Sequence, residues 1–381
     1  MHIPNKVNIL SRICKSFILV LVIVLLSLSI YSSVASQATC NNGACSDFTK
    51  NNAPLFTPQY TSLTTIYHKV VRGDYVANGT SLRNEPWDII TINGIPAGAT
   101  IEKAFLVWAI LNDTIVPSTI MVNGTLFNGV LAGTDVDYCW GVNYSYVFYA
   151  DVTSVVTGNG VYNISGYPTG TADFSDPWVS GVPPYAEGAS LIVIYSLPSE
   201  SLREIVVLIG DISTESFPVG TPINATININ YPIATPVEAK NTWIVADGQN
   251  TFLYDKALFE ETVVAGPGSS IRVNDAFPGL DHRTGVSSCG ALWDTLTIDV
   301  SNLVSPGDTS FIASIQNDPD EWDCLGYVAN VFSIKVKAPT VVGGEIIESN
   351  VSIGTSMLIS IILISLAIAM IYLYSIYKKK Y

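Results

Sequence analysis

The stretch DVTSVVTGNG at residues 151–160 returns as DVSNLVSPGD at residues 299–308, and this repeat decides the fold. Both copies read D-V-[ST]-x-[VL]-V-[ST] and then continue into a turn sequence that contains glycine. An aspartate at the end of a strand can accept hydrogen bonds from nearby backbone N–H groups, and glycine and proline favour a tight turn. The repeat therefore predicts two copies of one unit, a strand that ends at aspartate, a short turn and a return strand.

Short apolar runs rich in valine, isoleucine, tyrosine, phenylalanine and threonine surround both copies, and helical periodicity is nearly absent between residues 37 and 350. A run with tryptophan precedes each copy, FLVWAI at 105–110 and TWIV at 242–245. A long apolar run follows each, SLIVIYSL at 190–197 and YVANVFSIKV at 327–336. This pattern indicates an antiparallel all-β fold. The predicted strands are residues 101–111, 118–122, 144–150, 160–165, 189–197, 204–209, 225–231, 242–245, 296–300, 310–315 and 327–336.

Eleven strands exceed the number in one ordinary β-sandwich, and the repeat divides them into two sets. We therefore predict two β-sandwich domains in tandem. The expected boundaries are an N-terminal extension at 37–66, a first domain at 67–198 and a second domain at 199–339.

Both ends of the chain carry membrane-targeting patterns. Three basic residues in the first 16 precede the apolar run FILVLVIVLLSLSI at 17–30, and small residues follow. This order predicts a signal peptide over residues 1–36, with an uncleaved signal anchor as the alternative. At the other end, the segment from Met357 to Tyr377 has 21 residues without a charge, enough for about 31 Å of helix.

Tyrosines gather near the end of that segment, and Lys378, Lys379 and Lys380 follow it. Lysines beside a membrane span stay preferentially on the cytoplasmic side. We therefore predict one transmembrane helix at 356–377, a juxtamembrane stalk at 340–355 and a cytoplasmic tail at 378–381. The large remainder is expected outside the cell, anchored to its membrane.

The expected ectodomain is strongly acidic. All 32 acidic residues and 12 of the 18 basic ones lie in it, which gives a formal charge of −20. Such a surface repels nucleic acid and favours solubility, so nucleic-acid partners are excluded.

Five of the six cysteines lie in the expected ectodomain, where disulfides persist. An odd number leaves at most two bridges within one chain. The absence of a C-x-x-C pattern argues against a zinc site. The bridges that we predict are Cys289–Cys324, and Cys139 with either Cys40 or Cys45.

Two resemblances accompany the repeat. The segments MVNGTLFNG at 121–129 and YVFYADVTSVVTGNGVYNISG at 146–166 resemble the jelly-roll module of galactose-binding-like domains. Further motifs are GDYVANGTSLR (73–83), IPAGATIEKAFLVWA (95–109), CWG (139–141), DVTSVVTGNG (151–160), EGASLIVIYS (187–196), WDTLTIDVSNLV (293–304) and DCLGYVANVFSI (323–334). In these motifs, over about 260 residues, the chain resembles a family of archaeal and bacterial cell-surface proteins to which no activity is attached. The resemblance implies surface exposure and tandem jelly-roll-like modules.

No catalytic constellation stands out. His282, between Asp281 and Arg283, is the only histidine of the expected ectodomain near other polar groups, and Ser287 or Ser288 could complete a triad with it. The surrounding sequence lacks the G-x-S-x-G pattern of a nucleophile elbow. We therefore expect a solvated loop here and no enzyme.

Calcium is the one cofactor that we consider. The loop NDPDEWD at 317–323 is rich in the oxygen ligands that Ca²⁺ prefers, and similar jelly-roll modules hold a structural calcium ion in a loop. The candidate ligands are Asp318, Asp320 and Asp323, and an ordinary acidic loop is the alternative.

Surface chemistry adds two further expectations. Trp140, Tyr138 and Tyr144 could form a platform on which a sugar stacks, or could fill the core of a β-sandwich. The sequence also contains seven N-x-[ST] sequons, of which Asn163 lies in a predicted strand. The sites where we predict glycans are Asn78, Asn112, Asn123, Asn143, Asn224 and Asn350.

These observations predict a membrane-anchored cell-surface ectodomain for adhesion or ligand recognition, with carbohydrate binding as the leading specific version. The alternatives are a self-assembling component of a surface layer or virion-type envelope and, third, a secreted hydrolase. The expected partners are an extracellular protein or glycan, or further copies of the chain.

Overall fold

The computed structural model describes residues 61–178, 181–284, 290–320 and 323–338, together with the backbone of residues 40–41 and 44–45. The predicted signal peptide and the predicted transmembrane helix lie outside these residues. None of the helical segments in the described part has the length and apolar character that a membrane crossing requires.

The prediction of an all-β fold is confirmed, and every predicted strand overlaps an observed one. The short strands β1 (Cys40–Asn41) and β2 (Ala44–Cys45) pair with each other. Strand β3 (Thr61–Ser81) comes next, and the strands of the first half of the unit are β4 (Trp87–Ile92), β5 (Thr100–Asn112), β6 (Thr119–Val122), β7 (Thr125–Asn128), β8 (Val130–Val136), β9 (Tyr144–Asp151), β10 (Gly160–Ser165) and β11 (Tyr185–Ser196). Those of the second half are β12 (Leu202–Ser213), β13 (Ile223–Asn228), β14 (Ala239–Ala246), β15 (Lys256–Phe259), β16 (Thr262–Ala265), β17 (Trp293–Asp299), β18 (Ser310–Gln316) and β19 (Gly326–Lys335).

Strand β3 belongs to both halves. Its residues 61–72 pair with β12, whereas its residues 73–81 pair with β11. The shared strand joins nine strands in the order β17-β14-β19-β12-β3-β11-β5-β9-β8. At the changeover, a Cβ on Gly73 would lie 2.0 Å from the carbonyl oxygen of Tyr195, so only glycine fits there.

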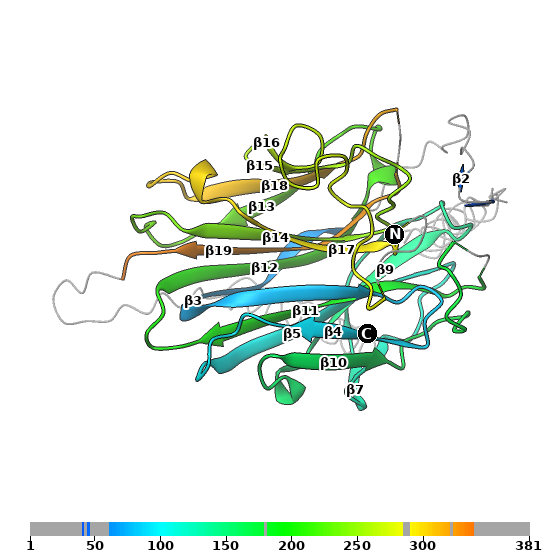
Figure 1. Ribbon diagram of the computed structural model, residues 1–381, viewed down its shortest axis with the longest axis horizontal. Coiled ribbons are helices and arrows are strands. Elements are labelled where there is room, and N and C mark those ends of the chain that lie inside the picture. The colour runs from blue at the N-terminus through cyan, green and yellow to red at the C-terminus, as the bar shows by residue number, and fades with distance from the viewer. Residues whose placement is uncertain are drawn as a thin grey trace, which may run out of the picture. The chain divides into compact units, whose positions relative to one another are not determined.

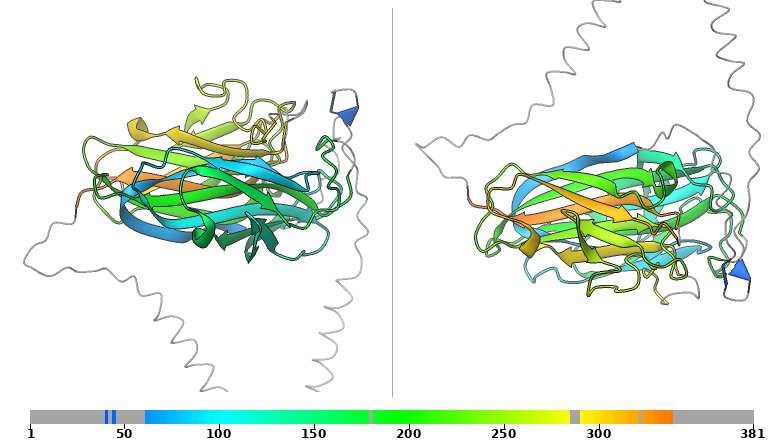
Figure 2. Two further views of the ribbon diagram at one scale, coloured as in Figure 1. Left: turned by 60° about the horizontal axis from the view of Figure 1, so that its bottom comes forward. Right: turned by 90° about the horizontal axis from the view of Figure 1, so that it is seen from above.

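The two parts of this nine-stranded sheet pack against each other, and each is covered on its outer face by a four-stranded sheet (Figures 1 and 2). Strands β4-β10-β6-β7 cover the first half and β13-β18-β15-β16 cover the second. The middle core contains side chains from both halves, such as Ile192 and Ile194 of β11 and Val207 and Ile209 of β12. The outer cores contain the fully buried Trp108 in the first half and Trp243 in the second.

Layering explains the two kinds of apolar pattern in the sequence. Inner strand β11 is buried along ten consecutive residues, because sheets cover both of its faces. Outer strand β13 alternates buried and exposed side chains, because one of its faces meets solvent.

The internal repeat has the predicted geometry in both copies. Asp151 Oδ1 accepts a hydrogen bond from the Thr153 N–H at 3.1 Å, and Asp299 Oδ1 accepts one from the Ser301 N–H at 2.8 Å. A 3₁₀ turn follows each aspartate, Thr153–Val155 in the first copy and Ser301–Leu303 in the second. The return strands are β10 and β18, so the two halves are built on one plan.

The two halves form one compact unit that ends at Lys337. The predicted boundary between residues 198 and 199 falls in the turn between β11 and β12, while β3 serves both sides of that boundary. Strand β3 itself was not predicted, because its sequence mixes polar and apolar residues without a clear period.

Candidate ligand-binding site

Loops from both halves converge at one end of the unit, which we call the loop end: the end at which β3, β8 and β14 finish and β11, β17 and β19 begin. The Ser81 N–H donates to the Asp281 carbonyl at 2.6 Å, and the Trp178 indole N–H donates to the Gly290 carbonyl at 3.1 Å. These contacts place the β16–β17 loop of the second half against the first half.

A disulfide between Cys139 and Cys324 also joins the halves here, with the two Cα atoms 6.5 Å apart. Our predicted pairings, Cys324 with Cys289 and Cys139 with Cys40 or Cys45, are therefore wrong for these two cysteines. The sequence alone does not show which cysteines meet, and the face-to-face packing of the halves brings together two loops that are 185 residues apart. Cys289 lies outside the described residues, and the backbones of Cys40 and Cys45 lie opposite each other in the β1–β2 pair.

At the loop end, His282 and Arg283 meet two carboxylates of the first half. Arg283 Nη1 lies 2.9 Å from Glu85 Oε2 and 2.9 Å from Asp88 Oδ1. His282 Nε2 lies 3.3 Å from Glu85 Oε1 and 3.7 Å from Asp88 Oδ2. The group is anchored by Asp88, which is fully buried and also accepts a hydrogen bond from the Thr80 hydroxyl at 2.5 Å.

Ion pairing sets the charge of this group. Burial disfavours the charged form of Arg283, but its bonds to Asp88 and Glu85 outweigh burial and raise the pKa of the guanidinium. Burial, with a further contribution from Glu85 and Asp88, raises the pKa of Tyr167, whose hydroxyl donates to the Glu85 carbonyl at 2.7 Å. Arginine and phenol therefore stay protonated at every physiological pH.

Two aromatic rings cover Arg283 from outside. The guanidinium carbon lies 4.9 Å from the ring centre of Trp87 and 5.2 Å from that of Phe174, which is cation–π geometry. The two rings meet edge to face at 6.0 Å. They nevertheless remain open to solvent, Trp87 with 40% and Phe174 with 50% of its surface exposed.

Phe174 has an unusual backbone as well. Its φ is +62°, in the left-handed region that bulky residues rarely adopt, and its N–H donates to the Asn84 carbonyl at 3.0 Å. Such a conformation costs of the order of 1–3 kcal/mol and is often kept at functional sites. We call Trp87, Phe174, Arg283, His282, Glu85 and Asp88 the aromatic site.

The aromatic site does not have the geometry of the triad considered from sequence. His282 Nδ1 lies 2.8 Å from the Thr284 hydroxyl and 3.3 Å from its N–H, which makes this contact part of a local turn. Ser287 and Ser288 lie outside the described residues.

The aromatic residues predicted as a sugar platform lie elsewhere at the loop end. Trp140 is half-buried: its ring lies 4.1 Å from the Arg83 guanidinium, and its indole N–H donates to Asp247 Oδ1 at 2.7 Å. Arg83 in turn forms a buried ion pair with Glu187. These contacts give Trp140 a packing role, while Tyr144 is 43% exposed.

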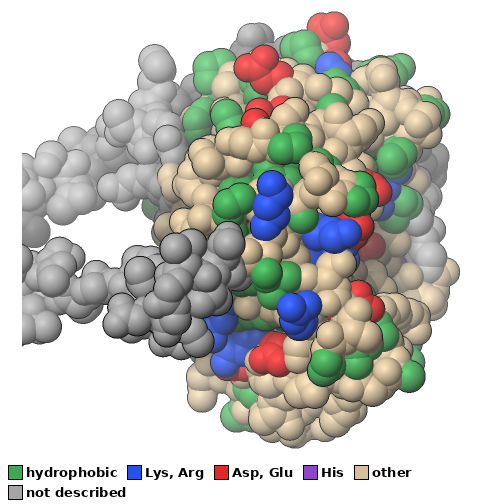
Figure 3. Space-filling model, turned by 90° about the vertical axis from the view of Figure 1, so that its left-hand side faces the viewer, with side chains coloured by type: hydrophobic (Ala, Val, Ile, Leu, Met, Phe, Trp, Pro, Cys, Tyr) green, Lys and Arg blue, Asp and Glu red, His purple; other side chains and the backbone are tan. Residues whose placement is uncertain are grey.

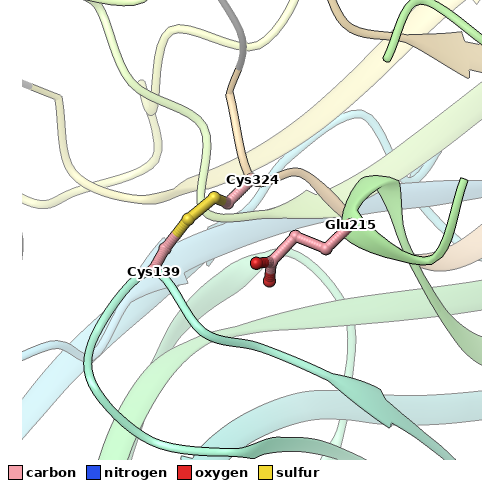
Figure 4. A group of neighbouring side chains, drawn as sticks. All are labelled: Cys139, Glu215 and Cys324. Carbon is pink, nitrogen blue, oxygen red and sulfur yellow. A yellow bond between two sulfur atoms is a disulfide. The ribbon is translucent and has the colours of Figure 1, made fainter. Parts of the chain in front are cut away.

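Glu215 faces the Cys139–Cys324 disulfide (Figure 4). This is the only group in the described part of the chain in which three His, Cys, Asp or Glu ligand atoms lie within 4.8 Å of one another. The two sulfur atoms are bonded to each other, so the group is not a metal centre in this structure. Burial raises the pKa of Glu215 to about 8, although the Tyr138 N–H, which donates to it at 2.9 Å, opposes that shift.

The predicted calcium ligands do not converge. Asp320 is exposed, and its N–H donates to Asp318 Oδ1 at 2.9 Å, whereas Asp323 is buried and accepts a hydrogen bond from the Cys324 N–H.

The predicted glycosylation sites differ in exposure. Asn123 and Asn224 are exposed, while Asn78, Asn112 and Asn143 are partly buried and hydrogen-bonded. Asn350 lies outside the described residues.

Sequence reasoning singled out His282 and Arg283 but missed their partners. The available signal was the segment NEPWD at 84–88, which combines two acids and a tryptophan between two strands. Nothing in the sequence marked Phe174, because it lies in a loop and the pattern of apolar residues predicts only strands and helices.

The opposite end of the unit has a different charge pattern. There Arg203, Lys240 and Lys335 pair with Asp74 and Glu238 near the strand ends. Figure 3 shows lysine and arginine side chains lying among acidic ones on this face. At the opposite end Asp74 and Glu238 are therefore paired with basic side chains, whereas several acids of the loop end are buried without a basic partner among the described ion pairs, Asp255 and Asp323 among them.

Comparison with known proteins adds little. No family model and no curated protein matches the chain. A solved structure titled "Structure of PNGF-II in C2 space group" is similar with a TM-score of 0.24 and 9% identity, over 73% of this chain and 65% of the other. The chain thus spans just under two thirds of that protein, and a likeness of this size carries no argument.

Proposed function

We propose that the protein is a membrane-anchored cell-surface ectodomain that binds carbohydrate at the aromatic site. One observation carries the proposal: Trp87 and Phe174 stay 40% and 50% exposed side by side, over an arginine held by two carboxylates. Large aromatic rings gain free energy on burial, so a paired, exposed arrangement is typical of a binding surface.

The chemistry of the aromatic site favours a neutral sugar. Aromatic faces stack against the C–H face of a pyranose ring, and charged side chains at the rim exchange hydrogen bonds with its hydroxyl groups. Glu85 and Asp88 already neutralise Arg283, so the site has no spare positive charge for an acidic sugar. The expected ligand is therefore rich in hydroxyls and uncharged.

A glycan array probed with the full-length protein in detergent tests the proposal, followed by calorimetric titration of the best ligand. Trp87→Ala should weaken binding about tenfold, which corresponds to about 1.4 kcal/mol, the range of an aromatic contact. Tyr144→Ala is the matched control, because Tyr144 is similarly exposed, at 43%, but lies in the β8–β9 region of the first half.

The pair of variants separates two platforms. If Tyr144→Ala lost binding while Trp87→Ala kept it, the sugar would bind at the aromatic residues predicted from sequence, which include Tyr144, and not at the aromatic site. Failure to bind any glycan, together with ordered self-assembly of the protein, would replace carbohydrate recognition with the structural alternative.

A further inference from the structure

The aromatic site lies at one end of a line of side chains that crosses the outer face of the first half. In the covering sheet β4-β10-β6-β7, Trp87 of β4 lies opposite Ser165 of β10, and Ser165 lies opposite Met121 of β6. Met121 in turn lies opposite Leu126 of β7. Residues directly opposite each other on neighbouring strands point to the same face of a sheet. We call these four residues the outer row.

The outer row is open to solvent along its length. Trp87 at one end and Leu126 at the other are 40% and 52% exposed, and the two residues between them are half-buried. A Cβ on Gly166 would lie 2.9 Å from Met121 Cγ, so the Met121 side chain lies against the end of β10. Neighbouring strands lie about 4.8 Å apart, which makes the row about 14 Å long. Several linked sugar rings fill such a length, and one ring does not.

No charged side chain faces outward from the four strands of this sheet. Their only acidic or basic residue is Asp88, which is fully buried. Strand β13, in the covering sheet of the second half, presents the polar residues Asn224, Thr226 and Asn228, so a strand in this position does not require outward apolar residues. Beside the outer row, the outward residues of the first sheet are Ile89, Thr91, Thr119, Asn128, Val161 and Asn163. The face is therefore neutral in a chain that has 32 acidic residues.

The area of this face favours a narrow ligand over a second copy of the chain. Its longest strands, β4 and β10, have six residues each. With about 4.8 Å between strands and about 3.4 Å per residue, the face of four strands covers about 400 Å². A specific protein–protein interface buries about 800 Å² on each partner. The face alone is thus about half of what a stable dimer needs, whereas a linear chain needs only the width of the row.

A neutral, linear glycan matches the chemistry of the outer row. Its rings have C–H faces that pack on Trp87, Met121 and Leu126, and its hydroxyl groups can exchange hydrogen bonds with the Ser165 hydroxyl between them. We propose that the glycan bound at the aromatic site is an extended chain that crosses β10 and β6 along the outer row and reaches Leu126. This inference rests on the proposed function and adds the length and the direction of its ligand.

Calorimetric titration of the full-length protein in detergent tests the proposal. The probes are neutral oligosaccharides of glucose, mannose and galactose, each from the monosaccharide to the hexasaccharide. The affinity for the sugar that binds should rise about tenfold as the chain grows to the length of the row, because Met121 and Leu126 add apolar contacts. Beyond that length the affinity should level off.

Three variants locate the ligand on the face. Leu126→Ala should weaken binding of the hexasaccharide about fivefold and leave binding of the monosaccharide unchanged, because only the longer ligand reaches β7. Trp87→Ala should weaken binding of both. Val161→Ala is the matched control and should change neither, because Val161 is 56% exposed on the same face but lies about 14 Å along β10 from Ser165.

The results separate the outer row from the aromatic site. Equal affinity for all chain lengths, or full hexasaccharide binding by Leu126→Ala, would overturn the extended row, while monosaccharide binding that depends on Trp87 would still support the aromatic site. An equal loss of affinity in Val161→Ala and Leu126→Ala would also overturn it, because the ligand would then not follow the row. Binding of no oligosaccharide at all would overturn both this inference and the proposed function.

Discussion

Replacing either cysteine of the Cys139–Cys324 bridge with serine should destabilise the whole unit. The bridge closes a loop of 185 residues and joins the β8–β9 loop of the first half to the β18–β19 loop of the second. In the chain-entropy account, opening a loop of about this length costs about 5 kcal/mol, at the upper end of the usual range. That is a large share of the 5–15 kcal/mol by which domains are normally stable.

Calorimetric melting under non-reducing conditions measures the effect. With an unfolding entropy of about 2.1 cal/mol/K per residue, about 5 kcal/mol in a unit of roughly 280 residues corresponds to a fall of about 9 °C. Cys139→Ser and Cys324→Ser should lower the melting temperature equally. The double variant should be no worse than either single variant, because all three remove the same link.

Cys289→Ser is the matched control and should leave the melting temperature nearly unchanged. If Cys289→Ser and Cys324→Ser instead lowered it together while Cys139→Ser did not, the bridge between the halves would be refuted. Peptide mapping without reduction provides an independent check, since it should recover the Cys139 and Cys324 peptides as one species.

Glu215→Gln should flatten the dependence of stability on pH. The pKa of Glu215 is about 8 in the folded protein, above its ordinary value of 4.5. Between these two pH values Glu215 keeps its proton in the folded state and loses it in the unfolded state, so the stability of the fold should fall as pH rises from 4.5 to about 8. Denaturant unfolding at pH 5 and pH 8 should show that the free energy of unfolding falls less between these pH values in the variant than in the unmodified protein. An equal fall in both proteins would contradict the raised pKa. Truncation before Ser356 should release a soluble product, whereas the full chain should stay in membranes after a carbonate wash. Recovery of the full-length protein in the soluble fraction would contradict the predicted transmembrane helix.

Local patterns in the sequence carry most of the secondary structure. Strands β5, β11 and β19 contain continuous apolar runs, and in both copies of the repeat the aspartate, Asp151 or Asp299, accepts a hydrogen bond from the backbone N–H two residues later. These features depend on neighbours within a few residues, which a single sequence displays directly. They suffice for the fold class and for the twofold internal plan.

Contacts between the halves leave no local trace in the sequence. Strand β3 pairs with β11 and β12 on either side of Gly73, a choice fixed by the two sheets and not by its own mixed composition. The same holds for Cys139 and Cys324, whose partnership depends on the packing of the two halves.

The shared strand also accounts for where the candidate sites lie. Two independent sandwiches in tandem would have no reason to keep His282 and Arg283 against Glu85 and Asp88, since these pairs come from different halves. Because β3 serves both halves and the inner sheets pack face to face, the loop ends of both halves are held together. The β16–β17 loop of the second half then carries Arg283 toward the aromatic site.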